Sequence, residues 1–168
     1  AQALSGVISD ILDLSKIEAG KLRLEATDFD LHALLESMEH GYAVLAEARG
    51  LMLEMVVRTG VPRRVRGDPA RLRQVLSNFL SNALKFTADG FVEVRLTDNA
   101  DGTLECLVRD SGRGIPEAAM ESLFEPFRRR QQPGDYAFSG SGLGLSICRK
   151  LVEAMGSELA VSTVQGEG

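Results

Sequence analysis

Residues 74–87, QVLSNFLSNALKFT, carry the pattern that most restricts how this chain of 168 residues can fold. Projected on a helix, the apolar residues of this region cover one side: Leu72, Val75, Leu76, Phe79, Leu80 and Ala83. The other side carries a polar stripe within an arc of roughly 80°: Arg71, Gln74, Asn78, Asn82 and Lys85. Asparagine is a mediocre helix former because its amide competes for backbone hydrogen bonds. A core helix with two amides and a lysine on one stripe therefore has either a solvated face or a face that binds something.

Apolar spacing predicts the other helices, and alternation predicts the strands. We expect helices over 1–17, 31–49, 69–86 and 143–156, with Asp30 and Asp68 at two of the N-termini and glycines 20, 50 and 156 after three of the C-termini. We expect strands over 21–25, 51–57, 90–97, 103–110 and 158–164, of which 90–97 and 103–110 form a hairpin. This order predicts an α/β fold, a two-layer sandwich in which helices cover one face of a mixed sheet.

The first helix carries a short apolar seam at Leu4, Val7, Ile11 and Leu14. Spacings of three and four residues are typical of a helix that packs along another helix. We interpret residues 1–17 as the tail of a longer helix, and the alternative is the first core helix of this domain.

Charge and composition exclude several classes. A net charge of −5 and a pI of about 5.1 disfavour a general nucleic-acid-binding protein. No apolar run approaches the roughly 20 residues that span a bilayer, and no signal peptide is visible, so we expect a cytoplasmic location. Cys106 and Cys148 stand singly in apolar patterns and are expected to be reduced and buried, and His32 and His40 join no ligand cluster.

Four local features call for a common explanation. They are the polar stripe, Asp110 at a strand end before Gly112 and Gly114, the pair Phe124 and Phe127 before Arg128, Arg129 and Arg130, and the run GSGLGL with glycines 140, 142 and 144. Each alone has an ordinary explanation: a solvated helix face, a turn, surface charge and turn chemistry. Residues 128–142 are by composition a long loop.

Together the four features suit a nucleoside triphosphate. Glycines before a helix let backbone N–H groups approach phosphate oxygens. Lysine and arginine neutralise the phosphates, and an asparagine oxygen can complete the coordination shell of Mg²⁺. A carboxylate can accept a hydrogen bond from an exocyclic amine, which selects adenine over guanine.

The segments QVLSNFLSNALKFT, VRDSGRGI, LFEPF and GSGLGLSICRKLVEAMG resemble, in order and spacing, the N, G1, F and G2 boxes of sensor histidine kinases. These enzymes belong to a wider ATPase superfamily that includes gyrase. The resemblance covers nearly everything from residue 28 onward. It implies the Bergerat fold, with residues 1–19 from the second dimerisation helix, 20–30 as a linker, and 31–168 as the catalytic ATP-binding domain with an ATP lid at about 128–142. Sequences similar to residues 9–31 are common in hybrid sensor kinases.

The resemblance also implies roles for individual residues. Asp110 would bind the adenine amino group, Asn82 would bind Mg²⁺, and Asn78 would contact metal, water or phosphate. Lys85 and Arg129 would reach the phosphates, so that Asn78, Lys85 and Arg129 form the catalytic set, with Arg128 and Arg130 as neighbours of the lid arginine. Further ATP-binding positions would be Phe86, Gly112, Gly114, Ile115, Phe127, Gly140, Gly142, Leu143 and Gly144.

Asn78 separates two branches of the superfamily. The gyrase-like branch typically has glutamate there as the base that activates water, and an amide cannot accept that proton. The sequence therefore favours transfer of phosphate to a histidine over hydrolysis. Neither His32 nor His40 lies in the family's acceptor motif, so we expect the acceptor on a dimerisation domain of the same kinase, a homodimeric parent, and a response regulator or receiver domain downstream.

Three alternatives stay open: an ATP-hydrolysing enzyme, a degenerate module that binds a partner, and a related kinase that acts on serine. The chain also departs from the family's pattern in two places. It has Met-Gly-Ser where Met-Gly-Gly is frequent, and it stops at QGEG before the usual final strand, which puts the last segment of the sheet in doubt.

Overall fold

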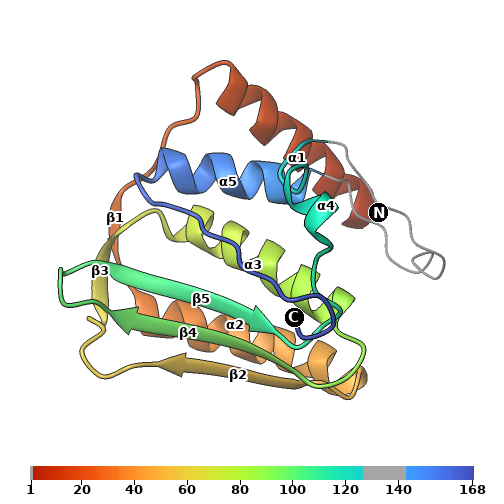
Figure 1. Ribbon diagram of the computed structural model, residues 1–168. Helices are drawn as coiled ribbons and strands as arrows, with labels where there is room; N and C mark the ends of the chain where they lie inside the picture. Colours follow the sequence, from red (N-terminus) through yellow and green to blue (C-terminus); the bar gives the residue numbers. More distant parts are fainter. Residues whose placement is uncertain (1, 127–142) are drawn as a thin grey trace. The chain divides into compact units, whose positions relative to one another are not determined.

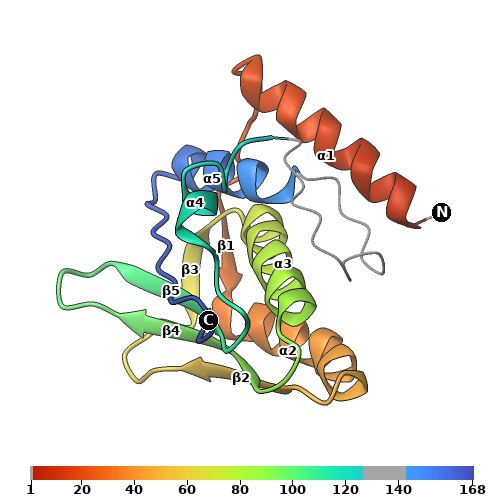
Figure 2. The same cartoon turned by 45° about the vertical axis from the view of Figure 1, so that its right-hand side comes forward.

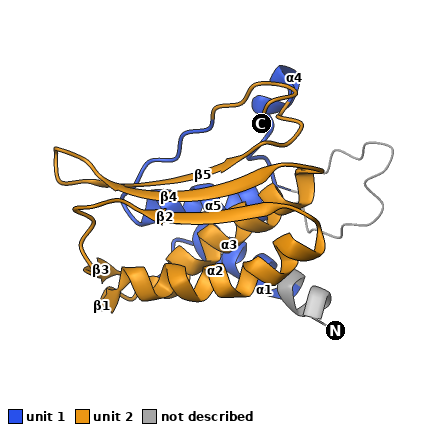
Figure 3. Cartoon of the chain, turned by 90° about the horizontal axis from the view of Figure 1, so that it is seen from below, with its two compact units in different colours: residues 1–24, 116–161 blue, residues 25–115, 162–168 orange. Residues whose placement is uncertain are grey.

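The computed structural model describes residues 2–126 and 143–168, with side chains from residue 8 onward. The chain divides into two units, which Figure 3 colours separately. Unit 1 comprises residues 1–24 and 116–161, and unit 2 comprises residues 25–115 and 162–168. The elements of each unit are described in turn.

Unit 2 is built on a three-stranded mixed sheet of order β2-β4-β5. Its strands are β2 (Met52–Val57), β4 (Phe91–Asp98) and β5 (Leu104–Asp110). β2 runs parallel to β4, and β4 and β5 form the antiparallel hairpin that the sequence predicts. Helices α2 (Leu31–Ala48) and α3 (Pro69–Phe86) lie together on one face of this sheet, as Figures 1 and 2 show. The predicted α/β sandwich is confirmed.

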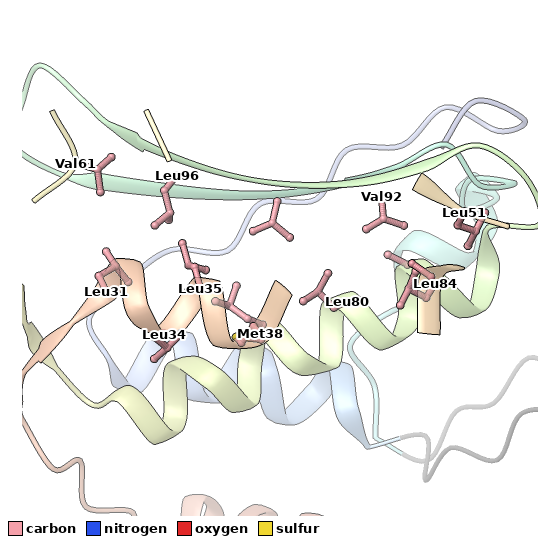
Figure 4. Packing of buried hydrophobic residues seen from close by; sticks show 14 residues of the cluster. Leu31, Leu34, Leu35, Met38, Leu51, Val61, Leu80, Leu84, Val92 and Leu96 are labelled. Carbon is pink, nitrogen blue, oxygen red and sulfur yellow. The ribbon is translucent and has the colours of Figure 1, made fainter. Parts of the chain in front are cut away.

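The core of unit 2 lies between this sheet and its two helices. In Figure 4, Val92 and Leu96 of β4 face Leu35 of α2 and Leu80 of α3. Val92 and Leu80 are completely buried. Each such side chain contributes about 1.5–3 kcal/mol through the hydrophobic effect. The apolar side of α3 therefore packs into the core, as its pattern predicts, and the polar side points away from the core.

Both helices of unit 2 begin at aspartate caps, as predicted. Asp30 Oδ1 accepts the N–H of Ala33 at 2.8 Å, and Asp68 Oδ1 accepts the N–H of Arg71 at 3.0 Å, with proline in the first turn of α3. The second carboxylate oxygen of Asp68 accepts the backbone N–H of Glu25 at 2.9 Å. The chain is therefore attached to the start of α3 where it enters unit 2.

A small second sheet corrects the sequence analysis. β1 (Thr27–Asp30) pairs antiparallel with β3 (Arg64–Gly67), and no strand was predicted at either place. Residues 21–25, the predicted strand, have no regular structure. Phe29 and Val65, which face each other in this pair, pack against the core, whereas no described strand pairs with 21–25. The contacts of Phe29 and Val65 with the core therefore stabilise this strand pair, although the sequence RRVR around Val65 is highly charged.

The predicted strand 158–164 is also wrong. Residues 157–164 have no regular structure, and the chain ends in a turn in which the N–H of Val164 donates to the carbonyl of Gly168 at 2.8 Å. Thr163 Oγ1 accepts the N–H of Ile115 at 2.8 Å, and the N–H of Gly166 donates to the carbonyl of Arg113 at 2.9 Å, so isolated hydrogen bonds and not a strand ladder join the C-terminal segment to the loop after β5. Cys106 on β5 is exposed, against the expectation that both cysteines are buried.

Unit 1 contains α1 (Gln2–Glu18), the single turn α4 (Glu117–Met120) and α5 (Gly144–Ala154). α1 lies along α5, and Lys150 Nζ of α5 is 3.5 Å from Glu18 Oε1. Of the predicted seam, Leu14 is buried and Ile11 is 45% exposed, while the side chains of Leu4 and Val7 lie outside the described residues. In the described part of the chain, no helix has the length and apolar character needed to cross a bilayer.

Candidate functional site

The polar stripe of α3 is an organised surface. Asn78 and Asn82 are both half-buried, and the side-chain N–H of Asn82 donates to the side-chain oxygen of Asn78 at 3.2 Å. One turn earlier, Arg71 donates to Gln74 Oε1 at 2.7 Å. Lys85 follows Asn82 by three residues and is half-buried. The oxygen of the Asn82 amide is the atom that this residue can offer to a cation, and the hydrogen bond from the amide nitrogen to Asn78 fixes the direction of that oxygen.

Asp110 ends β5 next to the end of this helix. Its Oδ1 accepts the backbone N–H of Gly112 at 2.9 Å and lies 3.5 Å from the hydroxyl of Thr87, which donates to it. Thr87 is the C-cap residue of α3 and is 1% exposed. α3 and β5 are also in contact with each other. The carboxylate that the sequence singles out is therefore held beside the C-terminal end of the asparagine helix.

Gly112 and Gly114 have no room for a side chain. A Cβ at Gly112 would lie 2.6 Å from Asp110 Oδ1 and 2.9 Å from the carbonyl oxygen of Phe86. Gly114 has φ of +66° and a Cβ there would collide with the carbonyl of Val164. The loop after β5 therefore packs directly against the end of α3 on one side and against the C-terminal segment on the other.

Three hydroxyl residues position this loop, and the sequence analysis missed all of them. The hydroxyl of Thr87 donates to Asp110, and Ser111 Oγ accepts the N–H of Phe91 at 2.9 Å. Thr163 Oγ1 accepts the N–H of Ile115. Thr87 and Ser111 stand inside the quoted segments, directly after Phe86 and Asp110. Their adjacency to two positions named from the sequence, Phe86 and Asp110, was the available signal, since hydroxyls in turns are common.

Phe86 forms the rim of the same region and is 37% exposed. Lys85 Nζ lies 4.9 Å from its ring centroid, and the guanidinium carbon of Arg113 lies 5.0 Å from it. Both distances are within the range of cation–π interactions. Unit 2 thus brings together eight of the positions named from the sequence: Asn78, Asn82, Lys85, Phe86, Asp110, Gly112, Gly114 and Ile115.

The other named positions belong to unit 1 or are not described. Leu143 is completely buried and directly precedes Gly144, the first residue of α5. Phe124 is half-buried, and the guanidinium of Arg149 lies 5.3 Å from its ring. The remaining named residues lie outside the described residues: Phe127, Arg128, Arg129, Arg130, Gly140 and Gly142.

Both histidines are bound to backbone carbonyls. His32 Nε2 lies 3.1 Å from the carbonyl of Val61, and His40 Nδ1 lies 2.7 Å from the carbonyl of Glu36 within α2. A ring nitrogen that donates to a carbonyl carries its proton there. Each histidine therefore has a local structural role in unit 2.

A comparison with protein families decides the classification. The model described as "Histidine kinase-, DNA gyrase B-, and HSP90-like ATPase" matches residues 67–168, from the cap of α3 through the end of the chain. The chain belongs to this ATPase family. Histidine kinases are among the curated proteins and among the solved structures to which the chain is similar.

One curated relative, the signal transduction histidine-protein kinase BarA of Escherichia coli, is 38% identical to this ATPase domain over 172 residues, covering 100% of the chain. The solved structure of full-length ShkA in complex with AMPPNP matches 98% of the chain with 30% identity and a TM-score of 0.84. The histidine kinase ThkA, solved in complex with the response regulator TrrA, matches 92% with 29% identity and a TM-score of 0.66.

These relatives are much longer than the chain. The ATPase domain spans 19% of BarA, 34% of the ShkA chain and 41% of the ThkA chain. The similarity to histidine kinases extends over α1 and residues 19–30 as well as over the part that the family model matches.

Proposed function

We propose that this ATPase domain binds Mg·ATP and positions the γ-phosphate for transfer to a histidine on the dimerisation domain of a sensor histidine kinase. The observation that carries the proposal is the Asn82–Asn78 hydrogen bond on the face of α3 beside Asp110. A pair of amides at this place can bind a metal-bound triphosphate but cannot deprotonate water.

The amide pair fits Mg²⁺ by its donor chemistry. Hard cations take oxygen ligands, and the bond from Asn82 Nδ2 to Asn78 leaves the Asn82 oxygen as a ligand. We propose that Asn82 holds the metal and that Asn78 orients the Asn82 amide while contacting water or phosphate. When bound, Mg²⁺ would neutralise charge on the phosphates.

Asp110 is proposed to select adenine. In the described part of the chain, both hydrogen bonds that Asp110 accepts go to Oδ1, so Oδ2 remains for an exocyclic amino group. The tight packing of Gly112 against Asp110 and Phe86 supports a fixed position for this carboxylate. Guanine presents a carbonyl oxygen where adenine presents its amine, and a carboxylate repels that oxygen.

Transfer would then depend on position and charge. Lys85 is proposed to contact the phosphates from the last turn of α3, together with Arg129, the lid glycines 140, 142 and 144, and Phe127 and Leu143 at the two ends of the lid. A fixed in-line geometry supplies much of the acceleration in phosphoryl transfer, and cations stabilise the charge that spreads over the transferred group. The incoming nucleophile would be an imidazole, for which no base on α3 is needed.

The proposal extends to partners and domain bounds. We propose residues 1–19 as the end of a dimerisation helix, 20–30 as the linker, and 31–168 as the catalytic domain of a homodimeric, cytoplasmic or membrane-attached and hybrid-type kinase. The name of BarA and the ThkA–TrrA complex support a histidine acceptor and a response regulator, respectively.

The test is ATP binding with and without Mg²⁺, followed by addition of a separate dimerisation domain that bears the histidine. Acid-labile phosphate on the added domain is the expected result, with the Asn82→Ala chain as the inactive control. ATP hydrolysis without transfer would support the gyrase-like alternative, phosphoserine would support the serine-kinase alternative, and absence of binding at millimolar Mg·ATP would support a degenerate module.

A further inference from the structure

We propose that Thr87 is a positioning residue for adenine recognition: its hydroxyl holds Oδ1 of Asp110, so that Oδ2 faces the exocyclic amino group of the base. The inference rests on the proposed function, in which Asp110 binds that amino group. Thr87 itself would not touch the nucleotide, and the sequence analysis assigns it no role.

The first observation is the burial of the Thr87 hydroxyl group. Thr87 is 1% exposed, and a buried hydroxyl that makes no hydrogen bond costs free energy. In the described part of the chain, this hydroxyl donates to Asp110 Oδ1 at 3.5 Å. An ionised carboxylate can only accept, so the direction of the bond is from Thr87 to Asp110.

The second observation is that two donors from different parts of unit 2 meet at one oxygen of Asp110. The N–H of Gly112, at 2.9 Å, comes from the loop that directly follows Asp110, whereas the hydroxyl of Thr87 comes from the end of α3. The terminal torsion of an aspartate side chain is broad, so a bond within its own loop restricts it little. The second donor limits this torsion and thereby the direction of Oδ2.

The third observation is the close packing around this oxygen. A Cβ at Gly112 would lie 2.6 Å from Asp110 Oδ1 and 3.2 Å from Thr87 Oγ1. The glycine therefore lets the loop approach both partners of the Thr87–Asp110 bond. Oδ1 lies inside this packed contact, and Oδ2 is the oxygen left for a ligand.

The fourth observation is that Thr87 is fixed to the asparagine helix. It is the C-cap residue of α3, and its backbone N–H donates to the carbonyl of Ala83 at 3.0 Å. Ala83 directly follows Asn82. The bond from Thr87 therefore connects the proposed base-binding carboxylate to the helix that carries the proposed metal ligand. A nucleotide that binds both groups needs a constant distance between them, and Thr87 would help to maintain it.

The inference makes the effect of Thr87 depend on the exocyclic amino group of the ligand. Purine riboside triphosphate has the ribose and phosphates of ATP but lacks this amino group, so it makes no bond to Oδ2 of Asp110. Loss of the Thr87 hydroxyl should therefore weaken the binding of ATP more than the binding of this analogue. The distance of 3.5 Å is long for a bond between two oxygens, so we expect a small effect.

The experiment is isothermal titration calorimetry of the 168-residue chain with ATP and with purine riboside triphosphate, each with excess Mg²⁺. Thr87→Val keeps the shape of the side chain and removes the hydroxyl. It is expected to weaken ATP binding about threefold, the low end for one hydrogen bond, and to leave binding of the analogue nearly unchanged. Thr87→Ala removes the same hydroxyl and replaces Thr87→Val in the series if the valine chain does not fold.

Two further variants serve as controls. Thr87→Ser keeps the hydroxyl and loses a methyl group, so it should keep the preference for ATP even if it lowers the unfolding temperature. Thr103→Val removes a hydroxyl in a matched setting, because Asp101 Oδ1 accepts both the hydroxyl of Thr103 at 2.6 Å and its backbone N–H at 2.9 Å. This pair lies at the opposite end of the β4–β5 hairpin, so the substitution should not change the binding of either nucleotide.

A preference for ATP that falls in Thr87→Val and is kept in Thr87→Ser supports the inference. Equal losses for the two nucleotides, an unchanged preference in a folded chain without the hydroxyl, or a preference that is also lost in Thr87→Ser would overturn it. The proposed function would survive any of these results as long as Asp110→Asn still weakens ATP binding. If the parent chain binds neither nucleotide, the proposed function itself fails, and the inference fails with it.

Discussion

The side-chain amide of Asn82 donates to the side-chain oxygen of Asn78, one helical turn earlier, at 3.2 Å. This bond orients the Asn82 amide, because it directs the amide nitrogen toward Asn78 and so fixes the direction of the amide oxygen. It also distinguishes the two asparagines: one presents oxygen, and the other holds it in place.

Asn82→Ala is expected to reduce ATP affinity in the presence of Mg²⁺ by about tenfold, or about 1.4 kcal/mol. Affinity measured in EDTA should change little, because the lost group is the proposed metal ligand. Asn78→Ala should have a smaller Mg²⁺-dependent effect. Gln74→Ala is the control, since it lies on the same stripe one turn before Asn78 and bonds Arg71. A similar loss in the Gln74 variant would argue against a specific role for the asparagine pair.

Asp110→Asn is expected to lower ATP affinity by roughly ten- to a hundredfold, because a charge-assisted hydrogen bond is worth about 1.5–3 kcal/mol. Thermal unfolding should change less, since an asparagine oxygen can still accept the N–H of Gly112. Asp101→Asn is a matched control: Asp101 also accepts the N–H two residues ahead, from Thr103 at 2.9 Å, at the opposite end of the β4–β5 hairpin. Unchanged ATP affinity in Asp110→Asn would show that the carboxylate does not bind the base.

Gly112→Ala is expected to destabilise the chain by about 1–3 kcal/mol, the usual cost of overpacking. The added methyl group would meet Asp110 Oδ1 and the Phe86 carbonyl, and ATP affinity should fall with stability. Gly41→Ala, in the middle of α2 with nothing within 4 Å of the new Cβ, should instead stabilise by about 0.5–1 kcal/mol. Urea unfolding followed by circular dichroism measures both, and equal effects of the two substitutions would contradict the packing described for the loop.

Asp68 is expected to make stability depend on pH. Partial burial disfavours its charged form, but the backbone N–H groups of Glu25 and Arg71 outweigh this and lower its pKa below 3.8. A lowered folded pKa means that the stabilisation is complete above 3.8 and is lost as the pH falls through the lower folded value. Asp68→Ala should cost about 1 kcal/mol at neutral pH and less in strong acid.

The measurement is the free energy of unfolding of both chains at neutral pH and at strongly acidic pH. Asp28→Ala is the control, since Asp28 is exposed and its carboxylate pairs with the exposed side chain of Arg66 at 3.4 Å. A penalty for Asp68→Ala that is the same at both pH values would rule out the carboxylate as its source.

Much of unit 2 could be predicted because its signals are local. The apolar face of α3, the caps Asp30 and Asp68, and the alternation in β4 and β5 each specify an element without knowledge of the rest. The stripe of α3 and Asp110 could be named for the same reason: both stand where a regular element makes the direction of a side chain predictable.

The failures depend on partners that are distant in sequence. β3 forms because Val65 and Phe29 reach one core, and the pattern RRVR gives little sign of this. Residues 158–164 alternate like a strand, but the chain after α5 bonds to the loop at Ile115 through Thr163. Thr87 and Ser111 were missed because a hydroxyl acquires a specific role only when its acceptor or donor is known.

The bond between Asp68 and the backbone of Glu25 has a mechanical consequence. A displacement of the backbone at Glu25 acts through this hydrogen bond on Asp68, the N-cap residue of the helix that carries both asparagines. Glu25 is thereby coupled, through one hydrogen bond, to the N-terminus of the helix that carries both asparagines.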